Sequence, residues 1–167
     1  MMNRNASYFI QKLDLIKHPE GGYYRESYRS HEIIHKEALP KQFNGNRVFS
    51  TAIYFLLESN DFSSFHRIKS DEIWHFYTGS SLTIYEIDSN GLLKITILGN
   101  TDNSYLQHAI PADTWFATEV IDENSYSLIG CTVAPGFDFD DFELGKRNAL
   151  LQKFPQHTDS ILKFTRE

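Results

Sequence analysis

Two side chains suited to catalysis, the imidazole of His66 and the carboxyl of Glu72, lie six residues apart in the sequence. An imidazole titrates near neutral pH, and a carboxyl beside it orients it and shifts its pKa. Such a pair suits general acid/base catalysis, in which a side chain takes a proton from the substrate or returns one. The alternative for His66 is a hydrogen-bonded structural histidine, and the alternative for Glu72 is a buried carboxylate satisfied by hydroxyls or an arginine.

Strand periodicity predicts how the residues after Glu72 are presented. Because side chains alternate along a β-strand, Trp74 shares the face of Glu72, and Phe76 continues that face. His75 takes the opposite face. If Glu72 faces a cavity, Trp74 and Phe76 would give that cavity an aromatic wall. The alternative for both aromatic residues is plain core packing.

A second stretch of interest is Tyr23 to Arg29 (YYRESYR), which follows a glycine-rich turn and is typical of a β-strand. Its arginines, Arg25 or Arg29, could meet an anionic group of a ligand, since the guanidinium fork matches carboxylates and phosphates. Tyr24 would line the same mouth. The structural alternative is a tight turn followed by a strand at a sheet edge, used at the interface with a partner subunit.

The composition sets limits on the class of protein. The 167 residues are 41% hydrophobic and 14% aromatic, which favours one domain with a packed core over a disordered chain. Sixteen basic and 22 acidic residues give a net charge of -6, so we expect no nucleic-acid partner and no membrane partner. The single cysteine cannot form an intramolecular disulfide, and the longest apolar run, Ala52 to Leu57, is too short for a membrane helix. We expect a cytoplasmic protein.

The elements that must position these residues are mostly short strands. A helix capped by Ser7 is expected near the N-terminus, and the polar stretch 31–46 predicts a loop or mobile flap. From Val48 onward, short β-rich runs are separated by Gly, Asn, Asp and Ser, which is typical of a sandwich or barrel. The sequence predicts a mostly β single domain over 1–167, with a helix and arm at 1–30, a barrel at 48–139 and a helical segment at 140–167.

Two motifs resemble those of the cupin superfamily. Glu72 lies seven positions before Gly79, as in the first cupin motif, and His66 stands at the position of that motif's second histidine. Ile110 to Phe116 (IPADTWF) resembles the second motif, a turn that leads to another inward ligand. Three blocks resemble one small cupin family in the expected order: His18 to Tyr24 (HPEGGYY), Asp71 to His75 (DEIWH) and Ala134 to Phe139 (APGFDF).

The resemblance implies a double-stranded β-helix, a jelly-roll (cupin) barrel with N-terminal and C-terminal helical flanks, in a homodimer. A full cupin metal site uses three His and one Glu. Here Ser64 stands where the first His would be, and Phe116 where the last would be. We therefore expect no bound cofactor; the alternative is a divalent metal at His66 and Glu72. The motif positions of His66 and Glu72 imply that both side chains point into the barrel, and we expect Ser64 to share the face of His66.

The resemblance also implies a chemistry. Cupin-fold epimerases that act on nucleotide-linked keto-sugars use a histidine at the position of His66, pair it with an acid, and return the proton from a tyrosine. We predict that the protein binds a small polar metabolite, carbohydrate-like or nucleotide-linked, and acts as an epimerase or isomerase with His66 as base and Glu72 as its partner. A non-catalytic small-molecule-binding module is the second hypothesis, and a metal-dependent cupin enzyme is the third. The candidate tyrosines are Tyr24, Tyr54, Tyr77 and Tyr85. The expected ligand-binding residues are Ser64, Trp74, Phe76, Phe116, Tyr24 and Arg25.

Overall fold

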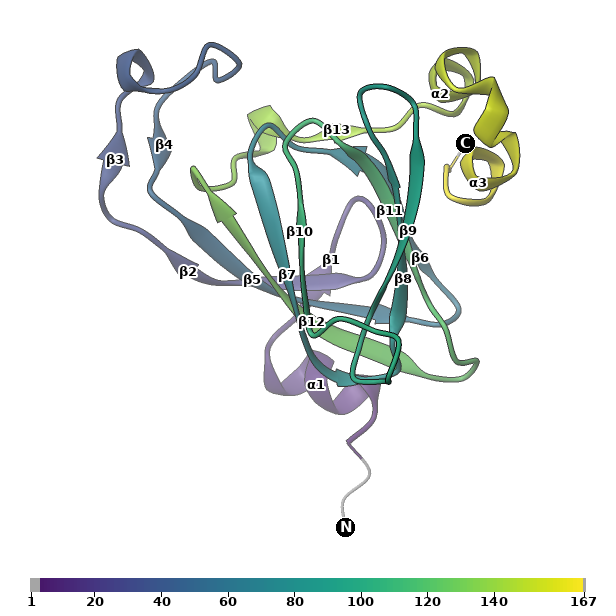
Figure 1. Ribbon diagram of the computed structural model, residues 1–167. Coiled ribbons are helices and arrows are strands. Elements are labelled where there is room, and N and C mark those ends of the chain that lie inside the picture. The colour runs from purple at the N-terminus through teal and green to yellow at the C-terminus, as the bar shows by residue number, and fades with distance from the viewer. Residues whose placement is uncertain (1–3, 167) are drawn as a thin grey trace.

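Two antiparallel β-sheets form the body of the protein (Figure 1). The computed structural model describes residues 4–166, so positions 1–3 and 167 of the expected domain lie outside the described residues. The six-stranded sheet has the order β1 (Ile16–Lys17), β2 (Tyr23–Arg29), β5 (Thr51–Glu58), β12 (Tyr126–Ala134), β7 (Asp71–Gly79) and β10 (Gln107–Ile110). The five-stranded sheet has the order β13 (Glu143–Leu144), β6 (Phe62–Arg67), β11 (Trp115–Val120), β8 (Leu82–Ile87) and β9 (Leu93–Leu98).

The main hydrophobic core lies between these sheets. Leu82 and Ile84 of β8 and Phe116 of β11 pack in one cluster with Phe55 of β5 and Ile129 of β12. Each is buried, and full burial of such a side chain stabilises the fold by about 1.5–3 kcal/mol. The mostly β barrel with small helical flanks that the sequence predicts is confirmed.

Helices cover parts of the outer faces of both sheets. At the C-terminus, α2 (Arg147–Lys153), a 3-10 turn (Pro155–His157) and α3 (Thr158–Lys163) pack on outward residues of the five-stranded sheet, at the upper right of Figure 1. At the N-terminus, α1 (Ala6–Lys12) packs against outward residues of β5 and β12. Its cap is Asn5 rather than the expected Ser7, because the Asn5 side chain accepts the backbone N–H of Tyr8 at 3.0 Å. Within residues 4–166, no helix has the length and apolar character that a membrane span requires.

The segment 31–46 is more ordered than the flap predicted from its polar sequence. It contains β3 (Ile33–Ile34) and a 3-10 turn (Lys36–Ala38), and β3 pairs with β4 (Arg47–Val48) in a hairpin that extends from the barrel (Figure 1). Arg47 anchors the hairpin through two 2.6 Å hydrogen bonds to buried Asp141, which lies in the 3-10 turn Phe139–Asp141. Arg47 and Asp141 are 94 positions apart in the sequence, so the periodicity of either segment could not predict this contact.

The strand Tyr23–Arg29 pairs with strands of its own chain. It lies between β1 and β5, with Tyr24 opposite Phe55 and Arg25 opposite Tyr54. Within the same sheet β1 covers only Tyr23 and Tyr24 of this strand, so the part from Arg25 to Arg29 pairs with β5 alone.

Candidate functional site

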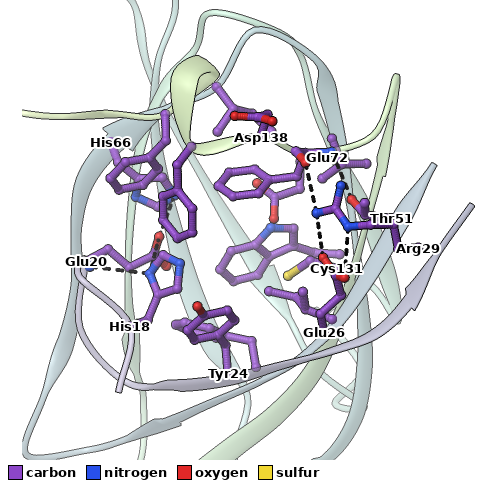
Figure 2. Close-up of a pocket in the computed structure, with 18 residues that line it drawn as sticks. His18, Glu20, Tyr24, Glu26, Arg29, Thr51, His66, Glu72, Cys131 and Asp138 are labelled. Atoms are coloured by element: carbon purple, nitrogen blue, oxygen red, sulfur yellow. Dashed lines mark hydrogen bonds and ion pairs between the residues drawn. The ribbon is translucent and has the colours of Figure 1, made fainter. Parts of the chain in front are cut away.

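A cavity of about 360 Å³ lies between the inner face of the six-stranded sheet and strand β6 (Figure 2). The turn after β1 and the segment 137–142, which follows β12, complete its wall. Its aromatic wall is formed by Tyr24, Phe55, Trp74, Phe137, Phe139 and Phe142. Its titratable side chains are His18, Glu20, Glu26, Arg29, His66, Glu72, Cys131 and Asp138. A concave, mostly apolar site with a few convergent polar groups is the usual form of a small-molecule pocket.

The turn after β1 carries Glu20 to the cavity wall. Gly21 has a φ of +121°, and a Cβ atom there would lie 2.1 Å from the carbonyl oxygen of Phe62, so only glycine fits against β6. The backbone N–H of Ser64 donates to the carbonyl of Glu20 at 2.8 Å, which holds the turn on that strand. This close docking places the Glu20 carboxyl beside the histidine of β6.

One oxygen of Glu20 joins two histidines. Glu20 Oε2 lies 3.1 Å from Nε2 of His66 and 3.2 Å from Nδ1 of His18, and the carboxyl lies between the two rings in Figure 2. The other oxygen, Oε1, accepts the hydroxyl of Ser63 at 2.8 Å. All four residues are nearly inaccessible to solvent or partly buried, so these contacts are made in a low-dielectric environment.

The members of this cluster shift one another's pKa values in different directions. Burial alone would lower the pKa of His18, but the carboxylate of Glu20 outweighs burial and raises it. Burial alone would raise the pKa of Glu20, and the charges of His66 and His18 lower it. Burial, together with the charge of His18, lowers the pKa of His66. The Glu20 carboxylate thus favours the protonated form of His18, and the two histidines favour the ionised form of Glu20.

Both ring nitrogens of His66 already have oxygen neighbours. Nδ1 lies 2.7 Å from the backbone carbonyl of Ser64, an obligate acceptor, and therefore carries a proton. Nε2 faces Oε2 of Glu20 at 3.1 Å, so the two groups titrate as a coupled pair. His66 is therefore engaged on both sides by the chain itself.

Glu72 has a different environment on β7. It is 8% exposed, lines the cavity, and has no Lys, Arg or His within ion-pair distance among residues 4–166. Burial and the nearby negative charge of Glu20 raise the pKa of Glu72 to about 7, and Cys131, Trp74 and His18 offset only part of this rise. Glu72 is thus a carboxyl that changes its protonation state near neutral pH inside an aromatic cavity.

At the side of the cavity formed by β2, Arg29 is paired with Glu26. Its Nε donates to Glu26 Oε1 at 2.9 Å, and its Nη2 donates to Glu26 Oε2 at 2.7 Å and to the carbonyl of Phe137 at 3.3 Å. The last contact ties β2 to the segment that follows β12 (Figure 2). Arg29 therefore shapes the cavity with its charge already compensated by Glu26.

Four residues predicted from the sequence lie on the cavity wall: His66, Glu72, Trp74 and Tyr24. The expected pairing of His66 with Glu72 is not formed among the described contacts, because the carboxyl that reaches His66 is that of Glu20. Glu20 and His18 were missed as site residues. Their position in the HPEGGYY block was the available signal, since a glycine pair marks a place where the backbone approaches another element closely.

The other predicted ligand contacts do not line the cavity. On β6, the register with β11 shifts between Ser63 and His66, so the alternation that placed Ser64 on the face of His66 is interrupted. Ser63 faces Glu20 instead, and the hydroxyl of Ser64 is buried with no hydrogen-bond partner among residues 4–166. Phe116 packs behind His66, with the ring centroids 4.1 Å apart.

A second interruption occurs on β2, where the register with β5 shifts between Glu26 and Tyr28. One extra residue therefore puts Arg29 on the same cavity side as Glu26. Exposed Arg25 precedes the shift and lies off the wall because it alternates with Tyr24 and Glu26. Phe76, further along β7 than Trp74, is packed against the core and does not reach the cavity.

Of the four candidate tyrosines, Tyr24 lines the cavity, and its ring lies 4.6 Å from that of His18. Tyr54 and Tyr77 contact each other at an open groove beside α1, on the other face of the sheet. Tyr85 donates its hydroxyl to Glu119 at 2.8 Å and packs on Phe164. Only Tyr24 among these four could meet a molecule in the cavity.

The residues at the cupin metal positions do not fit a metal site. Ser64 and Phe116 do not reach the cavity, and both ring nitrogens of His66 face oxygen atoms of the chain. Across residues 4–166, no three His, Cys, Asp or Glu side chains are grouped so that they could hold an ion. The donor set thus supports chemistry by the side chains themselves.

The two-sheet barrel and the positions of its motifs define a cupin, and the chain belongs to the cupin superfamily. Residues 7–145 match the family Cupin_5, described as Cupin superfamily (DUF985). The matched range includes His18, Glu20, His66, Glu72 and Asp138 of the cavity.

Individual relatives support this assignment. Protein SO0799 from Shewanella oneidensis has a TM-score of 0.87 and 40% identity, covering 98% of this chain and 99% of that chain. A hypothetical protein from Leishmania major has a TM-score of 0.88 and 31% identity over the same shares. The protein YML079W from Saccharomyces cerevisiae is 29% identical over 79% of this chain and 71% of its own length. Oxalate decarboxylase from Bacillus subtilis, with a TM-score of 0.55 and 14% identity over 89% of this chain and 36% of its own, shares the fold alone.

Proposed function

We propose that the protein binds a small carbonyl compound in the barrel cavity and isomerises it by moving a proton on the carbon next to the carbonyl. The observation that carries this proposal is that one cavity contains both a carboxyl and an imidazole whose pKa values are raised. Glu72 is a carboxyl with a pKa of about 7, and His18 is an imidazole whose pKa is raised by Glu20. Environments that shift two titratable groups in this way are a frequent mark of acid/base sites.

In the reaction we propose, the carboxylate of Glu72 takes the proton as the C–H bond breaks, and the electron pair moves to the carbonyl oxygen. The imidazolium of His18 stabilises the enolate oxygen that results. Glu20, held by His66 and Ser63, keeps His18 charged and is a positioning residue. Tyr24, beside His18, is the candidate to return a proton to the other face of the carbon in an epimerisation. This assignment moves the role of base from His66 to Glu72, because both nitrogens of His66 are engaged.

A nucleotide-linked ligand has less support than a small neutral or cationic one. The guanidinium on the wall, Arg29, is paired with Glu26, and the remaining uncompensated side chains are carboxyls. A diphosphate in this cavity would lie near those carboxyls without a free cation to bind it.

Deuterium exchange tests the proposal without knowledge of the physiological substrate. We would incubate a panel of small aldehydes, ketones and reducing sugars with the protein in D₂O and follow loss of the C–H signal next to the carbonyl by NMR. We expect exchange of one class of compound, reduced about 10²–10³-fold in His18→Gln, which removes the oxyanion donor. Tyr77→Phe, on the other face of the sheet, is the matched control and should exchange at the wild-type rate.

Binding without exchange would support the second hypothesis, a non-catalytic binding module. In that case a panel compound would show NMR contacts with the cavity, and no compound would exchange faster than in buffer. That result would contradict the isomerase proposal and leave the cavity as a ligand site.

A further inference from the structure

The cavity has an uneven distribution of charge once its internal pairs are accounted for. Glu26 is neutralised by Arg29, at 2.9 and 2.7 Å, and Glu20 is neutralised by His18, at 3.2 Å. Two carboxyls on the wall have no ion-pair partner among residues 4–166. These are Glu72 on β7, which is nine-tenths buried, and Asp138 in the segment after β12.

Asp138 has one oxygen committed to the backbone. Its Oδ1 accepts the N–H of Asp140 at 2.9 Å and so caps the 3-10 turn Phe139–Asp141. Because a neutral asparagine caps such a turn equally well, the negative charge of Asp138 is not needed for this local role. Arg29 and Arg47 interact with this charge without forming an ion pair with it, so the carboxylate can still contact a molecule in the cavity.

Aromatic rings surround these carboxyls. Phe137, Phe139 and Phe142 form a cluster with ring centroids 5.1 to 6.4 Å apart. Trp74 and Tyr24 complete the wall on the sheet side. The face of an aromatic ring carries negative potential and attracts a cation within about 6 Å, and such rings together with carboxylates bind ammonium groups.

We propose that the natural ligand of this cavity carries a positively charged nitrogen, as a protonated or quaternary amine, and has no phosphate or carboxylate group. The ammonium would lie against Asp138 and the rings of Phe137 and Phe139. This proposal rests on the proposed function for the carbonyl part of the ligand, which Glu72 and His18 would contact. It makes the substrate class an amine-bearing carbonyl compound.

Anionic ligands are disfavoured by the same charges. Like charges a few ångströms apart repel each other, and the repulsion is stronger in a partly buried site than in water. A phosphate placed in the cavity would meet this repulsion from Asp138 and from ionised Glu72, with Arg29 already bound to Glu26. A cation gains from the same interactions.

A pair of probes that differ only in charge tests this inference. Choline and 3,3-dimethyl-1-butanol have the same shape, and a carbon replaces the charged nitrogen in the second. Each gives one strong methyl signal, so their affinities for the full chain can be compared by ligand-observed NMR at one pH. We expect choline to bind at least about tenfold more tightly.

Two variants localise the effect. Asp138→Asn keeps the cap of the 3-10 turn and removes the charge, and we expect it to lose most of the preference for choline. Asp140→Asn is the matched control, since Asp140 is two residues away and does not line the cavity, and the preference should remain.

Four results would overturn the inference. Three concern affinity: equal affinity for the two probes, tighter binding of inorganic phosphate than of choline, and a preference for choline that is unchanged in Asp138→Asn. None of these three bears on deuterium exchange, so failure of this inference is separable from failure of the isomerase proposal. The fourth is exchange of a carbonyl compound without any binding of choline, which would contradict the cationic ligand while supporting the isomerase.

Discussion

Two buried histidine–glutamate pairs lie on either side of Phe116 in the five-stranded sheet. His66 is in register with Phe116 from β6, and Glu86 is in register with it from β8. In the first pair, His66 Nε2 lies 3.1 Å from Glu20; in the second, His108 Nε2 lies 2.7 Å from Glu86. Both carboxyls are about equally buried, at 5% and 4% exposure.

The surroundings of the two pairs differ more than the pairs themselves. Glu86 Oε2 also accepts the hydroxyl of Thr96 at 3.3 Å and has Lys94 at 3.9 Å, and the pair does not line the cavity. Glu20 is shared with a second imidazole, His18, at the wall of the cavity that also contains Glu72. A buried imidazole–carboxylate pair therefore does not by itself identify a reactive site; the cavity and the uncompensated carboxyl do.

The largest expected effect separates the two regions by reaction rate. Glu72→Gln removes the proposed base and should lower the rate of deuterium exchange about 10²–10⁴-fold, whereas Glu86→Gln should leave the rate near that of the wild type. In the wild type, the rate should rise with pH through about 7 as Glu72 ionises, and fall at higher pH as His18 loses its proton. Equal loss of rate in the two variants would show that the cavity carboxyl has no special role.

The second effect is on stability, and its sign differs between the two regions. The folded-state pKa of Glu72 is raised from 4.5 to about 7, so the folded protein binds more protons than the unfolded chain between these values. The free energy of unfolding therefore falls as pH rises from about 4.5 to about 7, and the penalty is fully present above pH 7. Glu72→Gln should be more stable than the wild type at pH 8 by on the order of 3 kcal/mol.

Glu86→Gln should have the opposite effect, because it breaks a charge-assisted hydrogen bond to His108. We expect a loss of about 1–3 kcal/mol in the free energy of unfolding. Urea denaturation of both variants and the wild type at pH 8 measures the two changes together. Destabilisation by both substitutions would contradict the description of Glu72 as an uncompensated carboxyl.

The smallest effect compares two adjacent serines of β6. The buried hydroxyl of Ser63 donates to Glu20 at 2.8 Å, whereas that of Ser64 has no hydrogen-bond partner among residues 4–166. Ser63→Ala should therefore cost about 1 kcal/mol of unfolding free energy, and Ser64→Ala, the matched control, should cost less. Thermal or urea unfolding checks this order, and the reverse order would contradict the shifted register of β6.

Regular alternation made part of the site predictable. On β7, Glu72 and Trp74 reach the cavity, and His75 lies on the other face, where it contacts Thr132 and Gln107. The two-residue alternation of side chains predicted the faces of this strand because its pairing with β12 is regular from Asp71 to Phe76. The jelly-roll barrel was predictable for the same reason, from short alternating strands and the cupin-like motifs.

Two features of the site were not available from the sequence. The first is the extra residue in β6 and in β2, which selects Ser63 over Ser64 and brings Arg29 to the cavity side of its strand; a bulge changes the face of every later residue and has no fixed sequence signature. The second is the docking of the turn at Glu20 on β6, which brings together residues 46 positions apart. Spacing along the chain reports local geometry and cannot show such a contact.

The central claim is that Glu72 is a cavity carboxyl that titrates near neutral pH. Its most direct test is a pH titration of the protein labelled with ¹³C at the glutamate side-chain carboxyls, with Glu72→Gln used to assign the signal. The account predicts that the Glu72 carboxyl titrates with a midpoint of about 7. A midpoint near the ordinary value of 4.5 would contradict it, because the carboxyl would then be ionised throughout the neutral range and compensated by a group that the account does not include.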